Sequence, residues 1–344
     1  MITTFMVLDA PQTLHAQSYD NAGDYISAMN AALSSMDETY LAYMSAVAHS
    51  GRARKVEKMR LQTLEAIQNC KYKISELPYY KGDNSLRLSG IGYVDLCYKV
   101  FNDDYNHIVN MEEIIEQSVD EMEAYLLLQE KTNEKINTAA EKMNKDVETF
   151  AAKYNVTLTE NKTELNENME IADALNHYKN LVYIVFFKCD WEDGQIVEAI
   201  NNKNLNNVEQ ARNALLKYAN DGMASLQTDS LNNFKGDHSL AQACMQAMKF
   251  YREMAETEIP KLTDFFLKQQ TFDKIKKAFD GKSENSRTKA DVDAYNKAVA
   301  DLNQGVSVFN DTNTKINNDR TRVINNFNEA QKNFLDAHMP HYKN

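Results

Sequence analysis

The amino-acid sequence predicts an all-α protein, built as a tandem duplication of an elongated up-and-down four-helix bundle. Three observations support this fold class. Only ten Gly and four Pro occur in 344 residues, so few positions interrupt helices. Apolar residues recur at alternating intervals of four and three, the spacing of left-handed helical bundles. Segments of the first half also recur in the second half.

The internal repeat has two landmarks. Residues 77–86 resemble residues 231–240, which lie 154 positions later, and both stretches contain Lys-Gly-Asp. Residues 132–137 resemble residues 312–317, which lie 180 positions later, so the second copy carries 26 additional residues between the landmarks. A repeating unit this long is a whole bundle and not one turn of a solenoid.

The first and last predicted helices of each copy carry the heptad seam. In the first helices the seam comprises Met29, Leu33, Met36, Tyr40, Tyr43 and Val47, and in the second copy Ile171, Leu175, Tyr178, Val182, Val185 and Cys189. In the last helices it runs from Ile136 to Tyr154 and from Ile316 to Phe334, with Arg320 as a polar interruption. One stripe of this kind faces partner helices.

Turn and cap residues predict the ends of the elements. In the first copy we expect helices at 21–49, 54–76, from the N-cap Asp83 to about 110, and at 117–154. In the second copy we expect helices at 169–193, 205–228, 238–278 and 288–338, with extra residues near 192–204 and a polar loop at 280–287. Pro260 is expected to kink the third helix of the second copy.

The predicted domain organisation follows from these helices. Residues 21–155 form the first bundle repeat and residues 169–344 form the second. Residues 156–168 are a linker or a helical continuation between them. Residues 1–20 are a signal-peptide remnant or a disordered arm.

Charge and hydropathy restrict the partners. The net charge is −12 and basic residues are scattered among acidic ones, which argues against nucleic acid and anionic membrane surfaces. The longest apolar run, Leu181–Phe187, is far shorter than the ~20 residues that span a bilayer, so no transmembrane segment is predicted.

The N-terminal segment resembles an export signal. Residues 2–8 are apolar, and the sequence Leu-His-Ala-Gln-Ser at 14–18 resembles a signal-peptidase site. No Lys or Arg precedes the apolar stretch, and Asp9 interrupts it. We expect that the protein is exported. The alternative is that it is cytosolic and that its N-terminal segment is a poorly ordered arm.

The four cysteines do not form a metal-binding or duplicated pattern. Cys70, Cys97, Cys189 and Cys244 have no CxxC spacing and do not align between the copies. We expect each to fill a core position as a small apolar residue, with a Cys70–Cys97 disulfide as the alternative.

Two His-containing pairs are the candidate metal ligands. Asp104 and His107 share one helical face, and His338 and His341 lie three apart near the C-terminus. A carboxylate-bridged bundle needs matching ligands from other helices, and the positions equivalent to the first pair are Glu258 and Lys261. We therefore predict a solvated surface and a frayed tail, with no metal and no cofactor.

No catalytic residues are predicted. The sequence lacks a nucleophile elbow, a phosphate-binding Gly-rich loop and a His-Glu-x-x-His motif. The stretch Asp190–Gly194 superficially resembles a calcium loop, but its spacing is wrong for an EF-hand. It is better explained as a helix end with Gly194 as the left-handed cap.

The repeated tripeptides and nearby aromatic residues are the candidate binding surface. Its members are Lys81, Gly82, Asp83, Lys235, Gly236 and Asp237, together with Tyr79, Tyr80 and Phe234. The structural explanation is the stronger one, because Gly supplies a turn conformation and Asp caps the following helix. Core packing likewise accounts for the aromatic residues.

The helical repeats, the Asn-, Lys-, Glu- and Tyr-rich composition and the signal-like N-terminus resemble uncharacterised all-helical surface or lipoprotein families of Gram-negative cell envelopes. This resemblance implies an envelope location and no assigned chemistry. We expect a non-enzymatic exported protein that binds or scaffolds a protein or glycan. The alternatives are a binder of iron, haem or another small ligand in the cleft between bundles, and a cytosolic helical adaptor.

Overall fold

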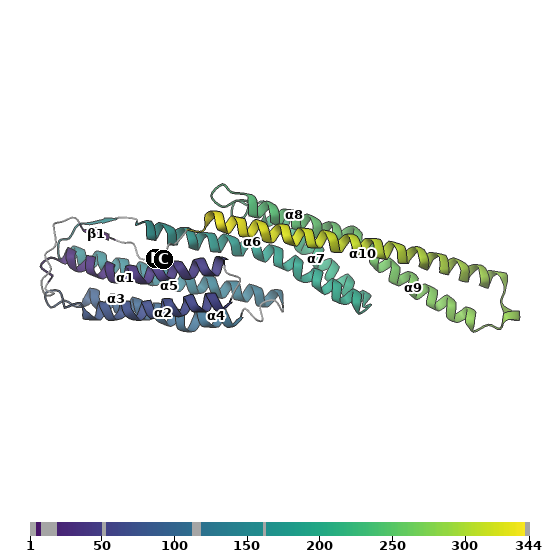
Figure 1. Cartoon of the computed structure of the whole chain (residues 1–344), viewed down its shortest axis with the longest axis horizontal. Helices are drawn as coiled ribbons and strands as arrows, with labels where there is room; N and C mark the ends of the chain where they lie inside the picture. The colour runs from purple at the N-terminus through teal and green to yellow at the C-terminus, as the bar shows by residue number, and fades with distance from the viewer. Residues whose placement is uncertain (1–4, 8–18, 50–52, 112–117, 161–162, 341–344) are drawn as a thin grey trace. The chain divides into compact units, whose positions relative to one another are not determined.

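The computed structural model describes residues 5–7, 19–49, 53–111, 118–160 and 163–340 (Figure 1). Helices make up nearly all of these residues, which confirms the all-α fold class. Among the described residues, only two three-residue strands occur, β1 (Phe5–Val7) and β2 (Leu158–Glu160). None of the helices in this part of the chain is both long and apolar enough to cross a bilayer.

The chain divides into two compact units. Unit 1 comprises residues 1–180 and 335–344, and unit 2 comprises residues 181–334. The division lies inside helix α6 (Glu164–Asn201). The predicted linker 156–168 is not a helical continuation, because helix α5 (Val119–Lys153) ends before it and strand β2 lies within it.

Unit 1 is a bundle of antiparallel helices with a small β ribbon. Helix α1 (Ala22–His49) packs on α2 (Ala53–Glu76), α2 packs on α3 (Ser85–Lys99), and α3 packs on α5. The third helix continues through a π-helix, η1 (Val100–Asp104), into α4 (Tyr105–Met111). Strands β1 and β2 pair antiparallel, with Met6 opposite Thr159. Residues 5–7 therefore form a strand, so the expectation of a disordered arm is wrong for them.

Unit 2 contains the remainder of α6, α7 (Leu205–Ser225), α8 (Ser239–Glu253), the π-helix η3 (Met254–Glu258), α9 (Ile259–Asp280) and most of α10 (Lys289–His338). A 3₁₀ turn, η4 (Glu284–Ser286), lies between α9 and α10. Rings of Phe186 and Phe327 stack with centroids 4.0 Å apart and join α6 to α10. Helix α6 continues to Asn201, so the predicted interruption near 192–204 is wrong.

The heptad seams form the core of each unit. Met29, Leu33, Met36, Tyr40 and Tyr43 are all buried, as the spacing of four and three predicts. Leu175, Tyr178, Val182 and Cys189 are buried in the same way on α6. Burial of each large apolar side chain contributes about 1.5–3 kcal/mol, so these stripes supply much of the driving force for folding.

The two Lys-Gly-Asp turns have the same conformation. Lys81 and Gly82 both have positive φ, 50° and 84°, and Lys235 and Gly236 repeat this with 51° and 89°. Each turn joins a bridged pair, Tyr80 with Asp83 and Phe234 with Asp237. Two successive residues with positive φ form a tight turn that favours Gly at its second position.

The aspartates of these turns accept a hydrogen bond from the first residue of the next helix, but they are not its N-caps. The backbone N–H of Ser85 donates to Asp83 Oδ1 at 2.8 Å, and Ser239 donates to Asp237 Oδ1 at 2.7 Å. The N-cap of α3 is Asn84, which makes no side-chain capping bond. The prediction of Asp83 as N-cap is thus wrong by one residue, although its role at the helix start is as expected.

The third helix of each copy contains a π-helix at the same repeat position. Segments η1 and η3 begin 154 positions apart, the spacing of the sequence repeat. The first copy has Asn106 where the second has Pro260, so the proline does not cause the interruption. Pro260 lies in the first turn of α9, directly after η3, so the predicted irregularity of this helix begins before the proline.

Each π-helix is completed by an arginine from the preceding helix. A π-helix adds one residue to a turn and leaves a carbonyl oxygen without its usual partner. Arg60 Nη1 donates to the Phe101 carbonyl oxygen at 2.7 Å, and Arg212 Nη1 donates to the Ala255 carbonyl oxygen at 3.3 Å. Both arginines also form an ion pair with the glutamate three residues earlier.

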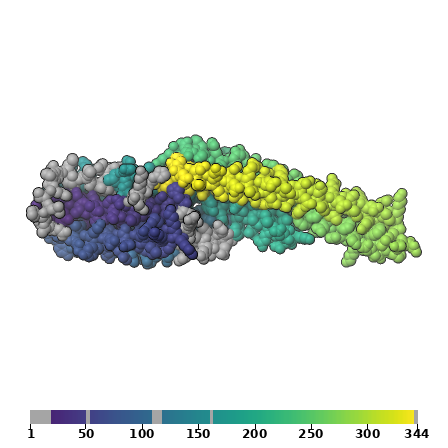
Figure 2. Space-filling model, in the orientation of Figure 1, coloured from purple at the N-terminus to yellow at the C-terminus, as the bar shows by residue number. Residues whose placement is uncertain are grey.

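The hairpin of α9 and α10 in unit 2 is longer than the corresponding part of unit 1. By the 154-residue offset, the end of α9 at Asp280 corresponds to residue 126, well beyond the end of α4 at Met111. Ring contacts hold this extension together, Phe265 and Phe266 against Phe309, and Phe272 and Phe279 against Tyr295. Most side chains of the extension are exposed, and α10 lies at the surface in Figure 2.

Replacing Arg60 with Met should destabilise unit 1 by about 2 kcal/mol, because the buried Phe101 carbonyl would lose its donor. Arg54→Met on the same helix is the control, since Arg54 is exposed and should change stability by less than about 0.5 kcal/mol. Urea denaturation, together with hydrogen exchange of the backbone amides of residues 93–111, measures the difference in stability between the two variants. Equal effects of both variants would contradict the role given to Arg60.

Three glycines of unit 1 should respond differently to alanine. Gly82→Ala should lower the free energy of unfolding by about 1 kcal/mol, because the φ of Gly82 is +84°. Gly90→Ala should lose about 1–3 kcal/mol because the new Cβ would lie 2.8 Å from buried Met29 Sδ. Gly92→Ala, with open space around it, should gain about 0.5–1 kcal/mol. Urea denaturation should give this order, and a gain at Gly90 would contradict the packing.

Candidate functional site

The first pair of candidate metal ligands, Asp104 and His107, lies outside the core. Asp104 forms an ion pair with Lys135 at 2.5 Å, and His107 is exposed. The heptad spacing of α3 places Asp104 and His107 on the seam after Val100, but the extra residue of η1 moves the buried positions to Tyr105 and Ile108. The π-helix therefore turns both candidates away from the core.

Of the two C-terminal candidates, only His338 lies among the described residues. His338 is half-buried at the end of α10, and His341 lies outside the described residues. Within the described part of the chain, no group of three or more His, Cys, Asp or Glu side chains is arranged to hold a metal ion.

The candidate binding surface is only partly exposed. Tyr80 and Phe234 are buried, so their assignment to a binding surface is wrong: both pack against residues of the last helix of their unit. Tyr79 is exposed, and the Arg87 guanidinium lies 5.0 Å from its ring centre. Asp83 also accepts from Lys153 Nζ at 2.7 Å, which ties the turn to α5 and holds the pKa of Asp83 well below its usual range.

The cysteines occupy the core as predicted. All four are buried and free, so the alternative Cys70–Cys97 disulfide is wrong. Burial raises the pKa of Cys70 and of Cys97 to about 12. These thiols are protonated and inaccessible at neutral pH, which makes them poor nucleophiles.

The polar interruption at Arg320 has a partner inside unit 2. Its guanidinium binds Asp193 through Nε–Oδ2 at 2.5 Å and Nη2–Oδ1 at 2.7 Å. Asp193 is buried within α6, and Gly194 also lies inside this helix without a positive φ. The prediction of a helix end capped by Gly194 is wrong, because the Asp193–Arg320 pair allows the helix to continue.

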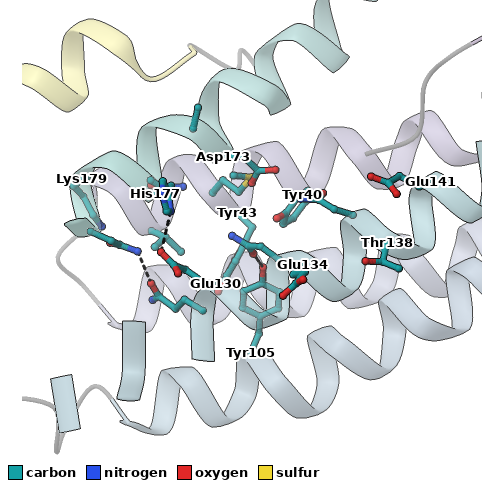
Figure 3. Close-up of a pocket in the computed structure, with 18 residues that line it drawn as sticks. Tyr40, Tyr43, Tyr105, Glu130, Glu134, Thr138, Glu141, Asp173, His177 and Lys179 are labelled. Atoms are coloured by element: carbon teal, nitrogen blue, oxygen red, sulfur yellow. Dashed lines mark hydrogen bonds and ion pairs between the residues drawn. The ribbon is translucent and has the colours of Figure 1, made fainter. Parts of the chain in front are cut away.

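A pocket lies in unit 1, between α1, α4, α5 and the first part of α6 (Figure 3). Its volume is about 550 Å³, within the range of small-molecule sites. The lining residues are Tyr40, Tyr43, Met44, Val47, Tyr105, Gln129, Glu130, Asn133, Glu134, Asn137, Thr138, Glu141, Asp173, Ala174, Asn176, His177, Lys179 and Asn180.

Helical spacing explains why these side chains meet. The residues from α5 recur at intervals of three and four between Gln129 and Glu141, and so form one face of that helix. The residues from α6 do the same between Asp173 and Asn180. Two polar helix faces therefore meet the tyrosine-bearing seam of α1. We did not predict this pocket, although the polar faces at helical spacing are visible in the sequence.

Tyrosines form the floor of the pocket. The rings of Tyr43 and Tyr105 contact edge to face with centroids 5.3 Å apart, and Tyr40 packs against Phe101 at 5.5 Å. The Tyr105 hydroxyl donates to Asn133 Oδ1 at 2.6 Å. Burial raises the pKa of Tyr40 and Tyr105, and the nearby Asp173 charge adds to both shifts. Asp173 therefore lies close to the tyrosine floor.

The walls contain both satisfied and unsatisfied polar groups. His177 Nδ1 lies 2.9 Å from Glu130 Oε1, and Asn180 Nδ2 donates to Gln129 Oε1 at 3.1 Å (Figure 3). In contrast, Asp173 Oδ1 is buried and has no hydrogen-bond partner, and the same is true of Asn176 Oδ1. Unsatisfied buried polar atoms cost about 1–3 kcal/mol each, so their presence at a pocket indicates a missing ligand group or water.

A second cavity, of about 20 Å³, lies deeper in unit 1, and Tyr40 and Asp173 line both. It is also lined by Asp37, whose side chain is buried on α1. Burial raises the pKa of Asp37 to about 7 and the pKa of Asp173 to about 6. The core beneath the pocket thus contains carboxyl groups that are poorly solvated when ionised.

Unit 2 has a pocket of similar volume, about 540 Å³, on a different face of its bundle. Five of its charged residues, Glu253, Glu258, Lys315, Asp319 and Arg322, pair with one another. Lys315 Nζ lies 3.2 Å from Glu258 and 3.3 Å from Asp319, and Arg322 binds Asp319 at 2.7 Å. Because these charges are already compensated, this pocket is a weaker ligand site than that of unit 1.

Comparison with known proteins finds no match among family models, curated proteins or solved structures. The function is therefore inferred from the pocket.

The unfolding free energy should fall as pH rises from about 5 to 7. In this window the folded protein retains protons on Asp37 and Asp173, whose pKa values are raised from 3.8, whereas the unfolded chain has lost them. Asp37→Asn should remove its share of this slope and stabilise the protein at pH 8 by up to about 4 kcal/mol. Urea denaturation at several pH values tests this, with the exposed Asp120→Asn as control. An unchanged slope in Asp37→Asn would show that its carboxyl titrates normally.

Proposed function

We propose that this chain is an exported, non-enzymatic binding protein and that the pocket of unit 1 is its ligand site. One observation carries the proposal: a cavity of about 550 Å³ has a floor of three tyrosines and two buried oxygens that lack partners. Such a combination of apolar surface and a few unsatisfied polar groups is typical of small-ligand sites.

The aromatic floor is specific to unit 1, which supports a specialised role for its pocket. By the repeat offsets of 142 and 154, Tyr40 and Tyr43 correspond to Val182 and Val185, and Tyr105 corresponds to Ile259. Aliphatic residues at these positions would suffice for packing a bundle. Three buried tyrosine hydroxyls need hydrogen-bond partners and are costlier to accommodate, so a function for them is a reasonable inference.

We infer that the two units arose by duplication of one bundle. The support comes from features repeated at a single offset of 154: the positive-φ turns, the π-helices and the starts of α3 and α8. The ion pair of Asp104 with Lys135 is likewise repeated by Glu258 with Lys315. In this proposal, the first copy acquired the pocket while the second gained the longer hairpin.

The non-enzymatic part of the proposal rests on the sequence, in which no nucleophile elbow, phosphate-binding loop or His-Glu-x-x-His motif was found. The proposed ligands include the glycans expected from the sequence as well as charged small molecules. A protein partner and a cytosolic adaptor role remain the alternatives.

Export is supported by the apolar residues 2–8 and the signal-peptidase-like stretch 14–18. Cleavage after Ala16 would remove β1 and leave β2 without its strand partner. The first residue of the native protein therefore distinguishes an exported chain from one that retains the β ribbon.

Ala174→Trp should block the proposed site. Ala174 is exposed at the pocket and lies on α6, so a large side chain there fills the cavity without disturbing the core. Native mass spectrometry of protein purified from its own cells should show a small molecule on the wild type and at least about tenfold less on the variant. Ala124→Trp, at an exposed position outside the pocket, should retain it. Equal occupancy of all three proteins would refute the site.

A further inference from the structure

We propose that the pocket of unit 1 binds a small organic cation, in which an ammonium group is attached to an aliphatic or aromatic body. This inference rests on the proposed function, because it names the ligand class of the same site. Three properties of the lining support it: the unsatisfied hydrogen-bond acceptors, the balance of charge, and the arrangement of aromatic rings.

The buried polar atoms of the pocket that lack partners are acceptors. They are Oδ1 of Asp173 and Oδ1 of Asn176, which lie three residues apart on one face of α6. Among the donors of the lining, the Nδ2 group of Asn180 donates to Gln129 and the hydroxyl of Tyr105 donates to Asn133. An ammonium group has three donors and no acceptor, so it can donate hydrogen bonds to both unsatisfied oxygens.

The charge of the lining is also negative. Four carboxylates line the pocket, from Asp173, Glu130, Glu134 and Glu141, and Glu130 is bonded to His177. Among the described residues, neither Glu134 nor Glu141 forms an ion pair. The opposing group is Lys179; burial lowers the pKa of this amine to about 8, so it stays mostly protonated at pH 7, and one positive charge faces four carboxylates. An incoming cation would therefore meet an excess of negative charge.

The tyrosine floor complements a cation in the same place. Asp173 is close enough to Tyr40 and Tyr105 for its charge to raise the pKa of both hydroxyls. A cation held by Asp173 would thus lie beside aromatic rings, whose faces attract positive charge. Met44 and Val47 add apolar surface for the body of the ligand. Bound cation would also compensate the ionised Asp173, which is otherwise poorly solvated.

Isothermal titration calorimetry on the full chain tests the proposal with spermidine and phenethylamine as cations and N-acetylglucosamine as the neutral probe. We expect one bound amine per chain, weakened by added salt. Asp173→Asn should weaken binding by at least about tenfold, and Glu134→Gln by a smaller factor. Glu134 is exposed, so its variant is informative even if Asp173→Asn folds poorly. Matched controls are Asp120→Asn and Glu148→Gln, exposed carboxylates outside the pocket.

The outcomes separate the ligand class from the site itself. Equal losses in the site variants and the controls would show diffuse attraction to an acidic protein and would overturn the proposal. Binding of N-acetylglucosamine without binding of either amine would also overturn it. In that case the proposed function would survive, provided that Ala174→Trp removed the binding. If Ala174→Trp left amine binding unchanged, both the site and its cation specificity would be refuted.

Discussion

The tyrosine floor of the pocket depends on the hydrogen bond that Arg60 donates to the Phe101 carbonyl oxygen. The π-helix adds one residue to the third helix, which shifts the buried positions from Asp104 and His107 to Tyr105 and Ile108. Without a donor for the freed carbonyl, this shift would leave an unsatisfied polar group in the core. Arg60 thus permits the irregular turn, and the irregular turn places Tyr105 beside Tyr43.

The two units share the same structural elements but differ in how their buried polar groups are paired. Each has a Lys-Gly-Asp turn, a π-helix and an arginine that completes it, and these parts hold the bundle together. In unit 2 the buried carboxylate of Asp193 is compensated by the guanidinium of Arg320. In unit 1, Asp173 Oδ1 is left unsatisfied at a cavity. That asymmetry is the physical basis for placing the proposed ligand site in unit 1.

Ligand binding and stability would be opposed at this site. Asp37 and Asp173 lie where burial raises their pKa values, so a charge on either destabilises the folded unit at neutral pH. Apolar residues of similar size would make a more stable bundle. Retention of such groups is common at functional sites, where a destabilising arrangement is offset by binding. The proposed cation would supply that compensation for Asp173.

The sequence by itself determined the helices, because their spacing and turn chemistry are local. The seam from Met29 to Tyr43, the core cysteines and both Lys-Gly-Asp turns could all be predicted from residue type and interval. The tertiary structure decided what the heptad pattern could not encode. The extra residue of η1 shifts the buried positions by one, so that His107 is exposed. Asp193 is paired with the distant Arg320, and α6 continues beyond Gly194. The pocket likewise required four helices to meet, since the proximity of residues as distant in sequence as Tyr40 and Asp173 is not fixed by local spacing.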